Sequence, residues 1–360
     1  MQEKIRRLQK VMREKKIGLS IFMDLSFQKK DPNLRYFIGA DFEYFCLAVP
    51  QKGKAFLVVP GFEFERAKKL LGSKIRIVRP KIKRGLIDAV FKTLGSRARK
   101  IRKIGITGSI FSFNETKALR KRFRKVKIVD LTRELLKIRQ IKTDEEIRLI
   151  SKAAVIASDI VDECFSRFKS FKREEEVQGF LKKRTLERGC ELAFEPIVAT
   201  GKNASFAHHN PFGKINKGFG YIDFGVKYKG YCSDITREFY IGKPSKKEIN
   251  LYNMMLSTQE NAIKGIKEMK SFEELDKKVR ALLGKQHFTH GLGHGIGVEI
   301  HEFPNVPSSK EKAQSGMIFT IEPGYYIKDR LGIRIEEDIL ISGGKTIILT
   351  KISKKLRIFV

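Results

Sequence analysis

Tryptophan is absent from this chain of 360 residues, and the few cysteines are Cys46, Cys164, Cys190 and Cys232. These four are dispersed and form no CxxC pair, which argues against a disulfide framework and against a zinc–thiolate site. We therefore expect four free thiols and a reducing, cytoplasmic environment.

The sequence also lacks any apolar run of the ~18 to 20 residues that a bilayer-spanning helix requires. Its N-terminal stretch is charged and amphipathic, without the apolar region of a signal peptide. We expect neither membrane insertion nor secretion.

Acidic residues are scarce in the first part of the chain, and histidine is missing from it. Residues 1–140 carry 37 basic and 12 acidic side chains, whereas residues 141–360 carry 37 and 29. All six histidines lie between His208 and His301. This distribution indicates that bulk positive charge and chemistry belong to different domains.

Helical and strand patterns alternate through the first part, which predicts an α/β domain. Helices are expected near residues 2–16, 62–71, 83–95 and 114–123, and strands near 19–23, 45–49, 55–59, 75–78, 104–106 and 126–129. A connector follows, and Thr143 with Glu146 three residues later marks the start of a helix. We place the domains at residues 1–136 and 137–360.

The second part repeats one order of elements. Helices are expected near 144–168 and 173–188, followed by strands from about 192 to 241. Helices near 246–269 and 272–284 are again followed by strands, from about 290 to 359. The two halves share no obvious similarity letter by letter, so the repeat is one of element order only.

Two predicted hairpins in the second part each carry a pair of carboxylates. Asp223 and Asp234 lie on opposite arms of a turn at residues 229–230, roughly across from each other, and Glu322 and Glu336 occupy the arms of the second hairpin. Solvent-facing carboxylates are one interpretation of the first hairpin. Its apolar neighbours favour burial, and buried carboxylates at close range repel unless a proton or a cation neutralises them.

Histidines gather around a glycine-rich stretch between the hairpins. Glycines alternate from residue 291 to 297, so we expect an extended backbone that other groups approach closely, with His290, His294 and His301 around it. Two Asp, two Glu and one His would balance two divalent cations, and this donor set suits Mn(II), Co(II), Fe(II) or Zn(II). Such a pair could share a water, lower its pKa and polarise a carbonyl oxygen, which describes metal-assisted hydrolysis.

Five segments together resemble the pita-bread metallopeptidases, the family of prolidase (Xaa-Pro dipeptidase), aminopeptidase P and methionine aminopeptidase. They are GKNASFAHHNP, IDFGVKYKGYCSDITREF, HGLGHGIGVEIHEFP, FTIEPGYY and GIRIEEDI. The resemblance covers about residues 143–350, and the first domain resembles that of prolidases, aminopeptidase P and creatinase. It implies an α/β N-terminal domain followed by an α+β pita-bread catalytic domain with pseudo-two-fold symmetry.

The resemblance also implies the ligands of two divalent metal ions. Asp223 would chelate one metal, and His294 and Glu322 would bind the other. Asp234 and Glu336 would bridge both. A water or hydroxide between the two metals would attack the Xaa-Pro bond of a dipeptide or of a peptide N-terminus.

Further roles follow from the same resemblance. His208 and His301 would hold the substrate and stabilise the transition state, and Glu322 would accept a proton from the attacking water. Arg334 would lie just outside the ligands, and His290 beside the metal site. His209 matches a position that is often aromatic in relatives, and we assign it no role.

One departure leaves the substrate length open. Many prolidase-like members have a basic residue directly after the HExP run, where this chain has Asn305, and the nearby cations are Lys310 and Lys312. A dipeptidase must hold the carboxylate of proline, commonly with Arg or Lys. The short N-terminal domain favours a dipeptidase over a longer-peptide aminopeptidase.

Two other functions compete with this one. Residues 97–127 hold twelve basic residues and one acidic residue, which would suit a nucleic-acid or acidic-partner binding protein on a retired peptidase scaffold. The intact ligand set argues against that hypothesis and against a creatinase-like amidinohydrolase. We expect small proline-containing peptides as substrates, a homodimer by resemblance, and at most weak, non-specific binding of nucleic acid.

Overall fold

The computed structural model describes residues 1–24, 30–80 and 85–360. The chain divides into two units, Met1–Arg139 and Gln140–Val360. This division and the predicted boundary at residues 136 and 137 both fall in helix α6 (Thr132–Gln140). Among the described residues, no helix combines the length and the apolar character needed to cross a membrane.

The first unit is built on a six-stranded sheet with the strand order β4-β3-β2-β1-β5-β6. β2 runs antiparallel to β1 and β3, and the other neighbouring pairs are parallel. All six residues of β1 are buried, as expected for a strand that is covered on both faces. The strands are β1 (Leu19–Asp24), β2 (Phe45–Pro50), β3 (Phe56–Val58), β4 (Arg76–Val78), β5 (Lys103–Ile106) and β6 (Lys127–Asp130).

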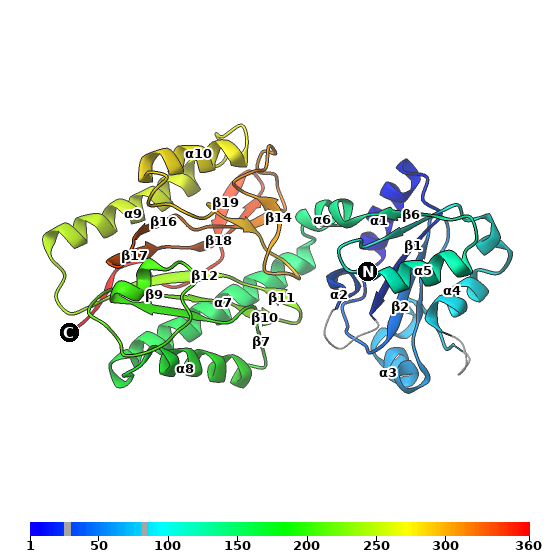
Figure 1. The fold of residues 1–360 in the computed structure, drawn as a ribbon, viewed down its shortest axis with the longest axis horizontal. Coiled ribbons are helices and arrows are strands. Elements are labelled where there is room, and N and C mark those ends of the chain that lie inside the picture. Colours follow the sequence, from blue (N-terminus) through cyan, green and yellow to red (C-terminus); the bar gives the residue numbers. More distant parts are fainter. Residues whose placement is uncertain (25–29, 81–84) are drawn as a thin grey trace. The chain divides into compact units, whose positions relative to one another are not determined.

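Helices and short 3-10 turns connect these strands (Figure 1). The predicted helices are confirmed as α1 (Gln2–Glu14), α3 (Gly61–Leu71), α4 (Leu86–Leu94) and α5 (Phe113–Arg122), and a 3-10 helix η2 (Gly95–Lys100) follows α4. The first residues of the helix predicted from 83 lie outside the described residues. Two helices were not predicted, α6 and α2 (Pro32–Ile38). The sequence does contain a helix-start signal for α2: the side chain of Asp31 caps the helix, and Pro32 occupies its first turn.

The second unit has two halves of similar order, each a pair of helices followed by strands. The helices are α7 (Asp144–Ser166), α8 (Glu174–Glu187), α9 (Lys246–Gly265) and α10 (Phe272–Leu283). The first half contains β7 (Glu191–Leu192), β8 (Ile197–Thr200), η4 (Gly201–Ser205), β9 (Gly218–Phe224), β10 (Val226–Tyr228), β11 (Tyr231–Cys232) and β12 (Ile235–Ile241). The second half contains β13 (His294–Gly295), β14 (Glu302–Asn305), β15 (Ile318–Ile321), β16 (Gly324–Ile327), β17 (Leu331–Arg334), β18 (Glu337–Ser342), β19 (Lys345–Ile348) and β20 (Arg357–Phe359).

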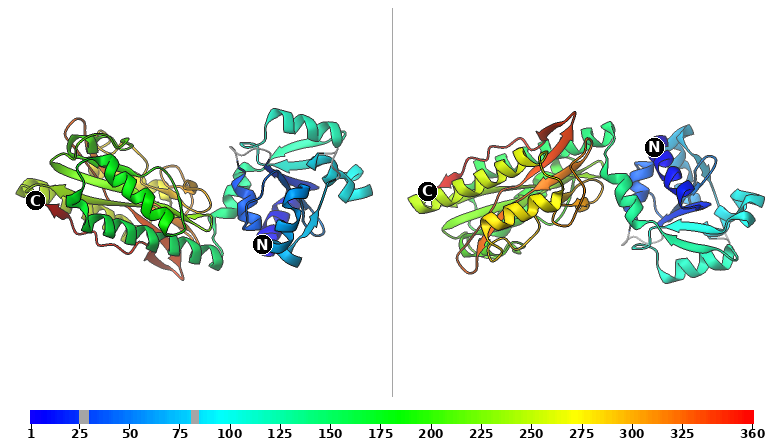
Figure 2. Two further views of the ribbon diagram at one scale, coloured as in Figure 1. Left: turned by 90° about the horizontal axis from the view of Figure 1, so that it is seen from below. Right: turned by 90° about the horizontal axis from the view of Figure 1, so that it is seen from above.

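The two helix pairs cover opposite faces of the strands in this unit (Figures 1 and 2). α7 and α8 bury apolar side chains against β9 and β12, in a core that includes Phe165, Leu181 and Phe239. α9 and α10 pack against β15 and β18, in a second core that includes Met255 and Phe319. The candidate metal ligands therefore lie on or directly beside strands whose positions are stabilised by hydrophobic packing against these helices.

The four cysteines are buried and free, as predicted, and all of them lie in the described part of the chain. Burial raises the pKa of the Cys164 and Cys232 thiols to about 12. Both side chains are therefore neutral at physiological pH.

Candidate metal centre

The first carboxylate pair lies where β9 meets β12. In this antiparallel pairing Asp223 lies opposite Thr236. Asp234 precedes Thr236 by two residues, so both point to the same face as Asp223. The predicted turn is present, since Lys229 and Gly230 both have positive φ, +47° and +83°, as a two-residue type I′ hairpin requires.

The two members of the second carboxylate pair, Glu322 and Glu336, lie opposite each other between two paired sets of strands. Ile321 of β15 pairs with Glu337 of β18, and Gly324 of β16 pairs with Arg334 of β17. Between these two points the register places Glu322 opposite Glu336. Glu322 and Glu336 both belong to short segments between strands. Their backbones are therefore outside the regular strand pairing, while the flanking strands determine their positions.

The glycine-rich stretch brings His294 to the carboxylates. A Cβ atom on Gly293 would lie 2.0 Å from the carbonyl oxygen of Thr320, and one on Gly295 would lie 2.0 Å from that of Phe303. The predicted close approach is confirmed at both glycines. His294 Nε2 lies 3.6 Å from Asp234 Oδ2 and 3.4 Å from Glu322 Oε1.

The ligand atoms of Asp234, His294 and Glu336 lie within 4.8 Å of one another, an arrangement that could hold a metal ion. The Oδ1 atoms of Asp223 and Asp234 are buried and have no hydrogen-bond partner in the described part of the chain. Orphaned carboxylate oxygens are costly without a cation. The donor set therefore fits divalent metal ions.

Electrostatics lead to the same conclusion. Burial, followed by repulsion from neighbouring carboxylates, raises the pKa of Asp234 and of Glu336 well above the usual values. Burial is also the main cause that raises the pKa of Glu322 to about 7. Without a metal these groups would hold protons that a divalent cation would displace.

The imidazole of His294 is held in its neutral form, the form that can bind a metal. Burial and then His301 lower the pKa of His294 to about 3. Its Nδ1 lies 3.1 Å from the carbonyl oxygen of Gly295, which makes Nδ1 the donor and leaves the Nε2 lone pair for a metal.

Several groups that orient the carboxylates were missed by the sequence analysis. The hydroxyl of Thr236 donates to Glu336 at 2.7 Å, and the hydroxyl of Thr320 donates to Glu322 at 3.2 Å. The carboxylate of Asp338 accepts from the backbone N–H of Asp234 at 3.1 Å. A period-two pattern was available as a signal for Thr236 and Thr320, because each lies two residues from a candidate ligand.

Arg334 neutralises one side of the site. Its buried guanidinium forms an ion pair with Asp223 and donates to the hydroxyl of Tyr326 at 2.8 Å. It also donates at 3.0 Å to the carbonyl of Ala207, next to His208. Arg334 therefore connects the candidate ligand Asp223 to the loop that carries His208, a candidate substrate-binding histidine.

The remaining histidines lie around the same centre. His301 is exposed, and its ring centroid is 4.1 Å from that of His294. His290 Nδ1 lies 3.8 Å from Glu322 Oε2. Burial is the largest cause that lowers the pKa of His290, partial desolvation is the largest cause that lowers the pKa of His301, and the nearby His208 contributes to both shifts.

His209 faces a different partner. Its Nε2 lies 2.7 Å from Glu174 Oε2, and Glu174 is fully buried. The Glu174 carboxylate also accepts hydrogen bonds from Thr200, Asn203 and the backbone of Phe212. Glu174 therefore anchors both ends of the loop that presents His208, a function that no local sequence signal indicates.

The position after the HExP run belongs to β14. Asn305 pairs with His294 across the β13–β14 ladder, and its side chain is exposed. Lys310 and Lys312 are also exposed.

Comparison with known proteins identifies the family of each unit. The model of metallopeptidase family M24 matches residues 148–343, and that of the creatinase/prolidase N-terminal domain matches residues 4–141. The chain is 33% identical to an Xaa-Pro dipeptidase from Pyrococcus furiosus over 99% of its own length and 100% of the relative.

Solved structures agree over the whole chain. An Xaa-Pro dipeptidase from Bacillus anthracis superposes with a TM-score of 0.87 at 29% identity, covering 99% of each chain. An X-Pro aminopeptidase from Thermotoga maritima gives a TM-score of 0.85 at 27% identity, covering 96% of this chain and 99% of that one. The predicted fold is confirmed, and the chain belongs to metallopeptidase family M24, with a creatinase/prolidase N-terminal domain.

Proposed function

We propose that this protein is a metal-dependent exopeptidase that hydrolyses the Xaa-Pro bond of dipeptides. The observation that carries the proposal is the convergence of two carboxylate pairs and a neutral histidine, with two buried carboxylate oxygens left without partners. Relatives of similar length that are named Xaa-Pro dipeptidases supply the substrate class.

Five residues would hold two divalent ions, namely Asp223, Asp234, His294, Glu322 and Glu336. Four carboxylate charges balance two divalent cations, and the imidazole adds none. When bound, the ions supply Lewis acidity for the peptide carbonyl and lower the pKa of a water.

The chain's own groups perform the remaining tasks. We assign Glu322 as the group that accepts the proton of the attacking water, because its carboxylate lies among the candidate ligands, 3.4 Å from His294 Nε2. His208 and His301 hold the substrate and stabilise the developing charge of the transition state, and both side chains are exposed to solvent and accessible to a peptide. Arg334 is a positioning residue that holds Asp223.

Substrate length is the point that separates the two named activities. We infer a dipeptidase. The structural similarity to the X-Pro aminopeptidase from Thermotoga maritima favours the second candidate, an aminopeptidase that acts on longer peptides. The test compares a metal-reloaded protein on an Xaa-Pro dipeptide, an Xaa-Pro-Xaa tripeptide and an Xaa-Ala dipeptide.

A dipeptidase cleaves the Xaa-Pro dipeptide and leaves both other peptides largely intact. Preference for the tripeptide would assign the aminopeptidase activity instead. Failure to cleave either proline peptide with any of Mn(II), Co(II), Fe(II) or Zn(II) would contradict the proposal and return the retired-scaffold hypothesis, which the comparisons do not favour.

A further inference from the structure

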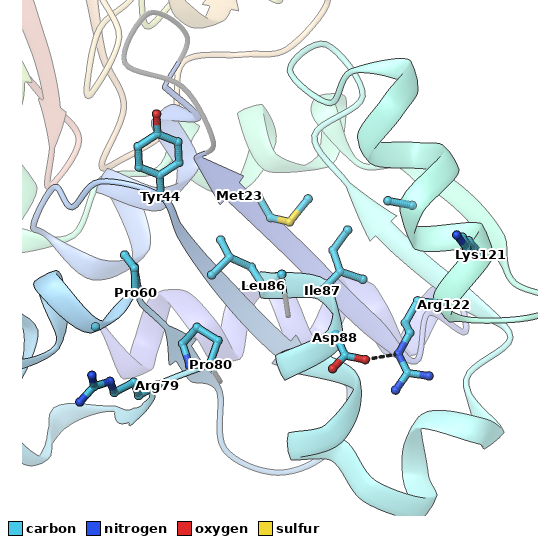
Figure 3. A pocket seen from close by; sticks show the side chains of 13 residues that line it. Met23, Tyr44, Pro60, Arg79, Pro80, Leu86, Ile87, Asp88, Lys121 and Arg122 are labelled. Carbon is cyan, nitrogen blue, oxygen red and sulfur yellow. Dashed lines mark ion pairs between the residues drawn. The ribbon is translucent and has the colours of Figure 1, made fainter. Parts of the chain in front are cut away.

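The first unit contains two cavities that the peptidase chemistry does not use. The larger one, of about 870 Å³, lies at the carboxyl ends of β1, β3 and β4 and is lined by Met23, Leu86 and Ile87 (Figure 3). Among its described lining residues, Asp88 is the one carboxylate, and it forms an ion pair with Arg122 at 2.8 Å (Figure 3). Residues 81–84, which lie in the sequence between the lining residues Pro80 and Gly85, are outside the described residues, and we propose no ligand for this cavity.

The smaller cavity, of about 470 Å³, has an unusual concentration of one charge. It lies where the end of α1, the turn after β2 and the η2 helix meet. Six of its lining residues are cationic, and no described residue that lines it is acidic. These cations are Arg13, Lys16, Lys52, Arg97, Lys100 and Arg102.

The charge of this cavity is not compensated within the described part of the chain. Neighbouring cations do find carboxylates: Lys15 pairs with Glu134 at 2.7 Å. None of the six lining cations forms such a pair among the described residues. The α1 and α4 helices end at the cavity, but two helix C-termini contribute only about −0.5 charge each. Their sum of about −1 is small against six positive charges.

Hydrogen bonds fix the backbone that carries these cations. The side-chain amide of Gln51 donates to the carbonyl oxygens of Met12 and Ile17, at 3.2 and 3.0 Å, and joins the turn after α1 to the turn after β2. The guanidinium of Arg102 donates to the carbonyl of Arg99 at 2.7 Å. These bonds hold the backbone of the cavity walls in place, while the six cationic side chains line the cavity from exposed positions and are accessible to an anion in solution.

Lys16 adds an independent observation. Its φ is +56°, in the left-handed region where glycine is the favoured residue at the end of a helix. A lysine at this position gives up backbone stability while adding a sixth charge to the cavity. A glycine here would remove the charge and relieve the backbone.

We propose that this cavity binds a compact polyanion, a short chain of phosphate groups either free or carried by a nucleotide. Its volume lies in the range of small-molecule sites and is too small to enclose a nucleic-acid duplex. Arginine and lysine are the residues that recognise phosphate oxygens, and six of them can contact several adjacent phosphates.

The test measures binding of inorganic tripolyphosphate to the full metal-loaded protein by calorimetry in ~150 mM salt. The Arg97→Gln/Lys100→Gln variant removes two lining charges, and Lys16→Gly removes one without backbone strain. The matched control, Arg120→Gln/Arg124→Gln, removes two exposed charges of the same unit that line neither cavity. Peptide hydrolysis, which these variants should retain, checks the fold of each protein.

We expect tripolyphosphate affinity to fall by at least about tenfold in the Arg97/Lys100 variant and measurably in Lys16→Gly, and by less than about twofold in the control. ATP should depend on the same residues, and a higher affinity for ATP than for tripolyphosphate would identify the nucleotide as the source. Orthophosphate should bind more weakly than either.

Equal losses of affinity in the variant and the control would mean diffuse charge screening. Unchanged binding in all variants would mean capture by the catalytic metals. Either result overturns the proposal. Binding of a single-stranded oligonucleotide, but not of tripolyphosphate, through Arg97 and Lys100 would overturn it in favour of a nucleic-acid surface.

Discussion

His208 and His301 differ from the candidate ligands in their surroundings, because both are exposed while Asp223, Asp234 and Glu336 are buried. If they contact substrate without binding metal, alanine at either position should reduce turnover by roughly 10²-fold, a typical acid–base contribution, with metal content unchanged. Turnover and metal content of each variant, measured together, check this expectation.

His209→Ala is the matched control for these two variants. Glu174 keeps its bonds from Thr200, Asn203 and Phe212 when His209 is removed, so this variant should retain most of its activity. Loss of metal in both the His208 and His301 variants would show instead that these residues are ligands.

The raised pKa values of the carboxylates predict that the metal-free protein becomes less stable as the pH rises. The pKa of Glu322 is about 7 in the fold and near 4.5 in the unfolded chain, so the folded protein binds more protons between these values. Its contribution to stability is complete below pH ~4.5 and is lost as the pH rises through ~7, on the order of 3 kcal/mol in total. The raised pKa values of Asp234 and Glu336 act in the same direction.

Urea unfolding of the stripped protein between pH 5 and pH 8 measures this effect. The free energy of unfolding should fall with pH in the wild type, and Glu322→Gln should flatten the slope. Mn(II) should cancel the loss, because it binds the ionised carboxylates. A metal-free protein that gains stability over this range would contradict the buried arrangement.

At the scale of elements, a buried ion pair connects the start of the second unit to the loop of His301. Lys142 Nζ lies 2.9 Å from Glu302 Oε2, and both side chains are 1% exposed. Lys142→Met removes the cation beside a buried carboxylate and should lower the free energy of unfolding by about 3–5 kcal/mol. Lys142→Met/Glu302→Gln should recover most of this loss, as measured by denaturant unfolding.

An exposed pair serves as the control for that cycle. Lys277 Nζ lies 2.5 Å from Glu273, with 69% of the lysine side chain exposed, so Lys277→Met should cost less than about 1 kcal/mol. Equal losses at Lys142 and Lys277 would show that burial of the first pair has no energetic consequence.

The elements also show what the sequence could and could not predict. The turn at Lys229 and Gly230 predicted that Asp223 and Asp234 lie roughly across from each other, and the structure pairs Asp223 with Thr236, two residues from Asp234. Glu174 was not predictable, because its partners lie 26 to 38 residues away and only the tertiary fold brings them together. Asp338 was missed for the same reason, since the backbone of Asp234, 104 residues away, determines its role.

At the scale of the whole molecule, two kinds of electrostatics are separated. The net charge of +33 is concentrated in the first unit, whereas the second unit gathers buried carboxyl groups with raised pKa values at the candidate metal centre. Six of the cations of the first unit line one cavity, and the polyanion proposal rests on this concentration. The homodimer implied by the family resemblance stays a prediction.

The most direct test of the account is metal content and Xaa-Pro dipeptide hydrolysis measured together, after stripping and reloading with Mn(II), in the wild type, Asp234→Asn and Glu336→Gln. Asp329→Asn, a change of the same kind at an exposed turn, is the control. We predict two ions per chain and restored hydrolysis in the wild type and the control, with reduced metal and no hydrolysis in the other two variants, because a neutral amide cannot balance the charge of two cations. Wild-type turnover with wild-type metal content in either Asp234→Asn or Glu336→Gln would contradict the assignment of this site.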